Sequence, residues 1–141
     1  MDKAEWKIAW SDALSVDVPE MDEEHRQFIA RVNDVNKAII DALDKTTVAH
    51  LMDLMQIEAA RHFQHEQQLL EQWNYPDATA HAERHAQLIA KFNHAMKEFQ
   101  ESDLSFVWAL KGLQIKQSLV EHLLREDMKY KEFLRSQKRS H

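Results

Sequence analysis

Apolar residues recur along most of this chain at the three- and four-residue spacing that places side chains on one face of an α-helix. The pattern predicts four long amphipathic helices with short breaks between them. Their expected ranges are residues 19–43, 48–72, 78–100 and 104–135. Helices of similar length joined by short loops favour an all-α, antiparallel, up-down-up-down four-helix bundle with an N-terminal arm, because consecutive helices then pack side by side.

The breaks between these stretches carry residues that start or stop helices. Asp17 is expected to cap the first helix, and Thr47 the second. Pro76 disfavours helical backbone at the residue before it, which marks the clearest turn of the chain. One domain is therefore predicted, with an arm, the bundle and a frayed tail at residues 1–18, 19–135 and 136–141.

The composition agrees with this organisation and excludes several classes of chemistry. One glycine and two prolines among 141 residues leave few sharp turns, and the absence of cysteine excludes disulfides, thiolate metal sites and cysteine nucleophiles. A net charge of -6 argues against nucleic acid as the main partner. No long apolar run and no signal-peptide core are present, so we expect a cytoplasmic protein without membrane insertion.

Several of the nine histidines occupy positions that face inward in the helical pattern. His25 shares the apolar stripe of the first helix with Phe28; by itself such a histidine is more often a hydrogen-bonded core residue than a metal ligand. His62 and Glu66 lie one turn apart on the second helix. Such a pair is common on solvated surfaces, but Leu69 continues the same face, which favours burial.

The third and fourth helices each contribute a similar pair. His81 and His85 are one turn apart and can converge on one ion. His122 and Asp127 lie about 140° apart around the helix axis, on either side of an inward face. Surface histidines and a solvated aspartate are the alternatives for each pair alone.

The combination of these residues carries the argument for a metal. Burying so many imidazoles and carboxylates without partners would cost several kcal/mol each, and a metal cluster removes that cost. Imidazole with carboxylate and no thiolate suits iron, manganese or zinc, and two carboxylates able to bridge suit a dinuclear site.

The order of these residues resembles the hemerythrin family, in particular its bacteriohemerythrin type, from about residue 9 to residue 130. Each motif alone is weak, but the ordered set is specific. The matching segments are Trp10-Ser-Asp-Ala-Leu, Val18-Pro-Glu-Met-Asp22-Glu-Glu-His25, His62-Phe-Gln-His-Glu66, Tyr75-Pro-Asp-Ala-Thr-Ala-His81-Ala-Glu-Arg-His85 and His122-Leu-Leu-Arg-Glu-Asp127.

The resemblance implies an oxo- or hydroxo-bridged centre of two iron ions. One iron would be held by His81, His85 and His122 and the other by His25 and His62, with Glu66 and Asp127 bridging them. One position on the iron with two histidines then stays open, and O2 would bind there. The resemblance thus predicts an oxygen carrier, store or supplier, and not an enzyme.

Four further residues are candidates for tuning such a centre. Phe28, Phe63 and Leu119 each lie one turn from an expected ligand and are candidate walls of an O2 pocket, with plain core packing as the alternative. Glu126 stands where the family usually has a small or apolar residue. It either approaches the cluster and accepts a hydrogen bond from a ligand imidazole, or turns to solvent, and we expect the second.

Three other functions stay open at this point. A sensory module would use O2 or redox state to change its contact with a protein partner, which the sequence does not identify. A di-iron enzyme would act on peroxide or nitric oxide, and Glu126 near the cluster would favour it. Manganese or zinc would occupy the same residues without O2 chemistry.

Overall fold

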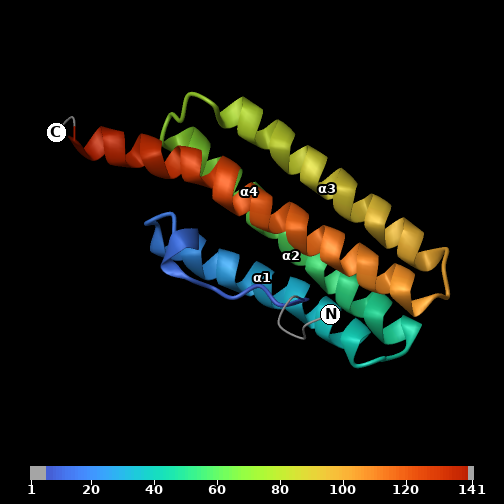
Figure 1. The fold of residues 1–141 in the computed structure, drawn as a ribbon. Coiled ribbons are helices and arrows are strands. Elements are labelled where there is room, and N and C mark those ends of the chain that lie inside the picture. Colours follow the sequence, from blue (N-terminus) through green and yellow to red (C-terminus); the bar gives the residue numbers. More distant parts are fainter. Residues whose placement is uncertain (1–5, 140–141) are drawn as a thin grey trace.

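The fold is a bundle of four α-helices, seen in a computed structural model that describes residues 6–139. No strand occurs within these residues. Consecutive helices are neighbours, and α1 also packs on α4, so the four helices close around one core in alternating directions (Figure 1). The elements are η2 (Asp12–Leu14), a short 3-10 helix, followed by α1 (Pro19–Ile40), α2 (Lys45–Gln72), α3 (Ala78–Gln100) and α4 (Ser105–Arg139). The predicted all-α four-helix bundle is confirmed.

The C-terminal ends of α1 and α2 are closed by the same backbone motif. Ala42 and Asn74 adopt left-handed conformations, with φ of 57° and 55°. The next residue then donates its N–H to the carbonyl five residues earlier, from Leu43 to Ala38 and from Tyr75 to Leu70, both at 3.0 Å. Because this motif ends the helix, α1 stops at Ile40, three residues before the predicted end.

The helix starts differ from the predicted caps. Asp44, rather than Thr47, caps α2, because its carboxylate accepts a hydrogen bond from the Thr47 N–H at 2.8 Å. The N-cap of α1 is Val18 and not Asp17. Asp17 instead pairs with Arg135 of α4, with 3.1 Å between the charged groups.

The far end of α4 also differs from the expectation. The helix continues to Arg139, four residues beyond the predicted end, so the segment expected as a tail begins inside α4. Residues 1–5 of the arm and residues 140–141 of the tail lie outside the described residues. The division into arm, bundle and tail stays a prediction.

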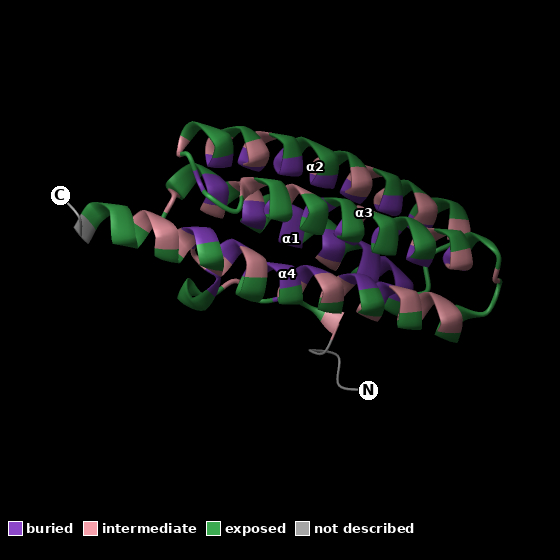
Figure 2. Cartoon of the chain, turned by 90° about the horizontal axis from the view of Figure 1, so that it is seen from above, coloured by how far each residue is buried: buried purple, intermediate pink, exposed green. Residues whose placement is uncertain are grey.

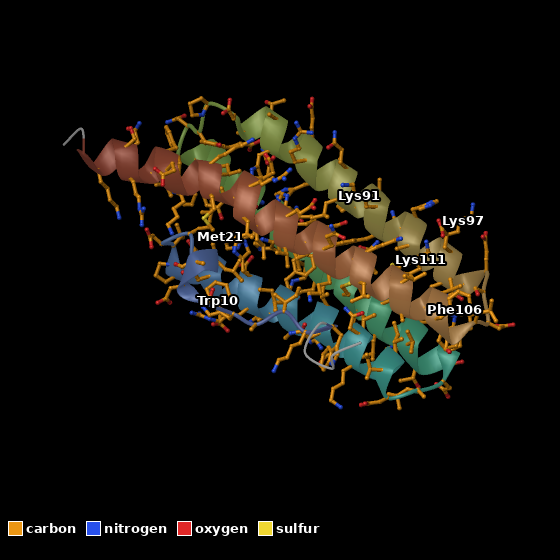
Figure 3. The ribbon with its side chains drawn as sticks, viewed as in Figure 1. Trp10, Met21, Lys91, Lys97, Phe106 and Lys111 are labelled. Carbon is orange, nitrogen blue, oxygen red and sulfur yellow. The ribbon has the colours of Figure 1, made fainter. Side chains whose placement is uncertain are left out.

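The inner faces of the helices are buried and the outer faces exposed, as the colouring in Figure 2 shows. Side chains fill the space between the ribbons, while Lys91 and Lys97 lie on the exposed side of α3 (Figure 3). Gly112 allows α1 and α4 to approach closely, because a Cβ there would lie 2.0 Å from Asn36 Oδ1. Among the residues that the structure describes, no helix is both long enough and apolar enough to cross a membrane.

Candidate metal centre

Seven buried polar residues meet in the bundle core, near the end where α2 turns into α3. None is more than 6% exposed. Every helix contributes at least one, and α2, α3 and α4 contribute two each. They are His25, His62, Glu66, His81, His85, His122 and Asp127. The structure thus brings together all seven residues that the sequence singled out, and we call them the histidine–carboxylate cluster.

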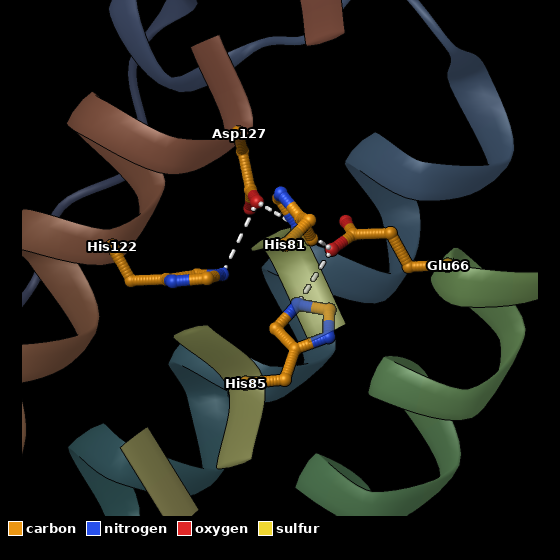
Figure 4. Close-up of side chains that lie close together, drawn as sticks. All are labelled: Glu66, His81, His85, His122 and Asp127. Atoms are coloured by element: carbon orange, nitrogen blue, oxygen red, sulfur yellow. Dashed lines mark hydrogen bonds and ion pairs between the residues drawn. The ribbon is translucent and has the colours of Figure 1, made fainter. Parts of the chain in front are cut away.

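Three histidines from α3 and α4 form one side of this cluster (Figure 4). His81 Nε2 lies 3.0 Å from Glu66 Oε1 and 3.1 Å from Asp127 Oδ1. His85 Nε2 lies 2.9 Å from the same Glu66 oxygen, and His122 Nε2 lies 3.2 Å from the same Asp127 oxygen. The three rings therefore aim Nε2 at the same two oxygens, Glu66 Oε1 and Asp127 Oδ1, and His81 lies near both of them.

The other side of the cluster is made by His25 and His62, from α1 and α2. His25 Nε2 lies 3.1 Å from Glu66 Oε2 and 3.3 Å from Asp127 Oδ2. His62 Nε2 lies 3.4 Å from Glu66 Oε2. The two carboxylates are thus shared, with one oxygen toward the three-histidine side and the other toward the two-histidine side.

The donor atoms fit a pair of bound cations. Both oxygens of Asp127, together with Nε2 of His85 and of His122, are buried and lie close to other cluster atoms, but none of them forms a hydrogen bond of suitable geometry among the described residues. Buried polar atoms are seldom left so, because each costs about 1–3 kcal/mol. Two groups of these residues, one on each side of the cluster and sharing Glu66, have donor atoms within 4.8 Å of one another. Imidazole with carboxylate suits iron, manganese or zinc.

The electrostatics keep both carboxylates ionised. Burial by itself raises the pKa of Glu66, but the charge of His62 and hydrogen bonds from the surrounding histidines outweigh it and hold the pKa well below the usual value. Burial and the charge of Glu66 likewise raise the pKa of Asp127, yet His122 and His81 bring it below its usual value. Two anionic ligands are therefore available at neutral pH.

The histidines divide into two kinds. Burial lowers the pKa of His62 and His81, but the neighbouring carboxylates outweigh it and raise the pKa to about 10 and about 9. The pKa of His85 is lowered, mainly by burial. Because a metal binds neutral imidazole, a cation entering this cluster displaces protons from His62 and His81.

Two further residues contact the cluster that the sequence analysis did not single out. The Tyr130 hydroxyl donates a hydrogen bond of 2.9 Å to Glu66 Oε2. Glu24 Oε1 lies 2.9 Å from His62 Nδ1. Tyr130 follows Asp127 by three residues and so lies on the same face of α4, and this spacing could have identified it from the sequence. No spacing rule joins Glu24 on α1 to a ring on α2.

The three candidate wall residues are all buried. The Phe63 ring stacks on His85 with 4.0 Å between centroids and lies 5.6 Å from His62. The Phe28 ring lies 6.1 Å from His62. Leu119 belongs to the same apolar core. Phe28 and Phe63 thus contact rings of the cluster, while the role of all three residues as walls of an O2 pocket stays a prediction.

Glu126 lies at the rim of the bundle, with its side chain 19% exposed. Its carboxylate pairs with Lys129 at 3.3 Å and with Arg84 at 3.9 Å. Within the described part of the chain, no hydrogen bond joins it to a histidine of the cluster. The carboxylate that departs from the family pattern is thus engaged by cations outside the cluster.

Comparison with known proteins agrees with this geometry. The model of the hemerythrin HHE cation-binding domain matches residues 16–134. A hemerythrin-like protein of Naegleria gruberi is 29% identical over 124 residues, covering 86% of this chain and 89% of that protein. A bacteriohemerythrin of Stenotrophomonas maltophilia (strain R551-3) is 25% identical over 96 residues, covering 68% and 62%.

A myohemerythrin of Sipunculus nudus is 25% identical over 122 residues, covering 86% of this chain and 89% of that protein. The matched family domain spans all four helices almost completely and contains every residue of the histidine–carboxylate cluster. The chain therefore belongs to the hemerythrin family of cation-binding domains.

Proposed function

We propose that this protein binds O2 reversibly at a di-iron centre held by the histidine–carboxylate cluster. One observation carries the proposal: Glu66 and Asp127 each turn one oxygen toward the three-histidine side and the other toward His25 on the two-histidine side. A carboxylate shared in this way is suited to bridging two cations. The resemblance to the hemerythrin family predicts that the cations are iron.

The residues of each side take different roles in this proposal. His81, His85 and His122 would hold one iron, and His25 and His62 the other, with both carboxylates and an oxo or hydroxo group as bridges. The two-histidine side has one protein ligand fewer, so an exogenous ligand fits there. When bound, the two iron ions supply the electrons that hold O2.

The surrounding residues support binding rather than turnover. Phe28 and Phe63 pack against His62 and His85 and keep water away from the apolar side of the cluster. Tyr130 holds the orientation of Glu66 through its hydroxyl. Glu126, the extra carboxylate that would favour an enzyme, is paired with Lys129 and Arg84 at the rim.

A cytoplasmic location stays a prediction from the sequence.

The test is anaerobic loading with ferrous iron followed by exposure to air. A visible charge-transfer band that appears with O2 and vanishes on deoxygenation would support the proposal. Irreversible oxidation within seconds would contradict it, and turnover of added peroxide or nitric oxide would favour an enzyme. His94→Ala is a matched control, because His94 lies on α3 outside the cluster and pairs with Glu98.

A further inference from the structure

The two sides of the cluster differ in what lies behind their rings. The described ion-pair partners of His81, His85 and His122 are Glu66 and Asp127 alone. His25 also faces only these carboxylates, and its Nδ1 is buried without a partner. A carboxylate from outside the cluster therefore reaches a cluster ring at one described place, His62.

That carboxylate belongs to Glu24, which precedes His25 on α1 and reaches across to α2. Its Oε1 lies 2.9 Å from His62 Nδ1, on the side of the ring that faces away from Glu66. Its other oxygen forms a hydrogen bond with Nδ1 of His65. One carboxylate thus links two histidines of the same helix.

His65 is itself held from two sides. Its Nδ1 faces Glu24, and its Nε2 lies 3.7 Å from Glu20 Oε2, one turn earlier on α1. His65 is partly exposed, with a side-chain exposure of 37%. Glu24 therefore has a fixed outer partner as well as an inner one, which restricts the rotamers it can adopt.

A carboxylate on Nδ1 determines what the opposite nitrogen can do. When Nδ1–H donates to Glu24, the neutral His62 ring carries its lone pair on Nε2, the atom that faces the cluster. Glu24 offers one carboxylate oxygen to Nδ1 of each histidine, so it can accept a hydrogen bond from both rings.

This arrangement lies at a solvent-accessible surface of the bundle. Glu24, His62 and His65 line a surface pocket of about 310 Å³ between α1 and α2. The two-histidine side also has one imidazole fewer than its counterpart. Loss of orientation at one ring therefore removes a larger share of the protein ligands there than it would on the three-histidine side.

We propose that Glu24, braced by His65, is the positioning residue that presents Nε2 of His62 to the centre, and that it thereby sets how tightly the two-histidine side holds its cation. The inference rests on the metal centre of the proposed function, but not on O2 binding.

The experiment titrates chelator-treated, full-length protein with Co2+ under argon, following the visible absorption of the bound ion. The unaltered protein should bind two ions. Glu24→Gln should leave one ion bound as tightly as before and weaken the other about 10- to 100-fold, the usual effect of losing an outer partner of a ligating histidine. Glu24→Asp, which keeps the carboxylate, should recover part of the loss, and His65→Gln should cause a smaller one.

Glu121→Gln is the matched control, because Glu121 lines the pocket beside His122 between α3 and α4. It should leave both binding steps unchanged. Circular dichroism of each chelator-treated variant checks the fold. Equal affinities of Glu24→Gln and the control for both ions would overturn the inference, as would equal weakening of both. Binding of fewer than two ions by the unaltered protein would overturn the metal centre with it, whereas failure to bind O2 would contradict only the proposed function.

Discussion

The two ends of the bundle core are equally buried but chemically opposite. Where α1 ends and α4 begins, the core consists of apolar side chains such as Met52, Phe99 and Ile115, none more than 1% exposed. At the other end the same inward stripes carry the histidine–carboxylate cluster, next to a smaller apolar group that includes Met21 and Leu70. The apolar end is stabilised mainly by burial, at about 25 cal/mol per Å² of apolar surface.

The cluster end is stabilised by different interactions. Its side chains leave water at a cost that is offset only where charges pair or a cation binds. Four buried donor and acceptor atoms on His85, His122 and Asp127 have no hydrogen-bond partner in the described chain. Metal and pH should therefore change the stability of the cluster end and leave the apolar end unaffected.

The largest effect is expected from His85→Ala at the cluster end. The substitution removes one of the three rings that face Glu66 and Asp127 from α3 and α4, so metal content should fall from two ions per chain to at most one. The apolar end should keep the helical circular dichroism. Elemental analysis of the purified variant measures the loss, and two ions per chain would show that the assigned ligand set is wrong.

The free energy of unfolding should depend on pH differently with and without metal. In the chelator-treated protein, His62 and His81 retain protons to pKa values of about 10 and about 9, whereas unfolded histidine loses them near 6.5. The folded state then binds more protons than the unfolded state, so the free energy of unfolding should fall as pH rises from 6.5 to about 9.

With a divalent cation bound, both rings are neutral in the folded state, and that fall should be absent or reversed. Urea unfolding across this pH range, with and without Co2+, measures the difference. A chelator-treated protein whose stability stays flat or rises would contradict the assigned charges of the cluster end.

Gly112→Ala should destabilise the apolar end without changing metal content. The new Cβ would lie 2.0 Å from Asn36 Oδ1 and 3.3 Å from Ile39 Cδ1. It would also disturb the 3.2 Å hydrogen bond from Asn36 Nδ2 to the Gly112 carbonyl. Overpacking costs about 1–3 kcal/mol, which exceeds the roughly 1 kcal/mol that a helix gains from alanine over glycine.

The midpoint of urea unfolding measures this change. In an Asn36→Ala background the obstructing amide is gone, so the same substitution should become neutral or stabilising. An equal penalty in both backgrounds would show that the contact with Asn36 is not its cause.

The smallest effect is expected from Tyr130→Phe. The ring keeps its contacts with Trp73 and Tyr75, while Glu66 loses one hydrogen bond of 2.9 Å and retains its histidine partners. The expected cost is about 1 kcal/mol in the chelator-treated protein, measured by urea unfolding. Tyr75→Phe is the control, since no hydrogen bond of its hydroxyl occurs among the described residues, and it should change nothing.

The sequence predicted the helices well where local signals act alone. The bounds of α3 are as predicted, because Pro76 and a capping break flank it. The end of α1 was placed too late because the left-handed residue that closes it is Ala42, whereas glycine is the usual signal. The cap of α2 was assigned to Thr47, whereas Asp44, three residues earlier, performs it, because both residue types can cap a helix and the sequence alone did not separate them.

The candidate site divides in the same way. The seven residues of the cluster were recognised from the sequence because helical spacing assigns each side chain to the inner face of its own helix. Which carboxylate oxygen faces which histidines, and the contact of Glu24 with His62, were not recognised. These depend on the axial register of one helix against another, which no single helix encodes.

The sequence by itself therefore determined a four-helix architecture, an inward-facing set of five histidines and two carboxylates, and a family resemblance that the comparisons confirmed. The tertiary structure alone decided how Glu66 and Asp127 are shared, that Glu126 is held at the rim, and that Gly112 meets Asn36. The physical reason is that periodicity is a property of one helix, whereas distances between side chains on different helices follow from packing.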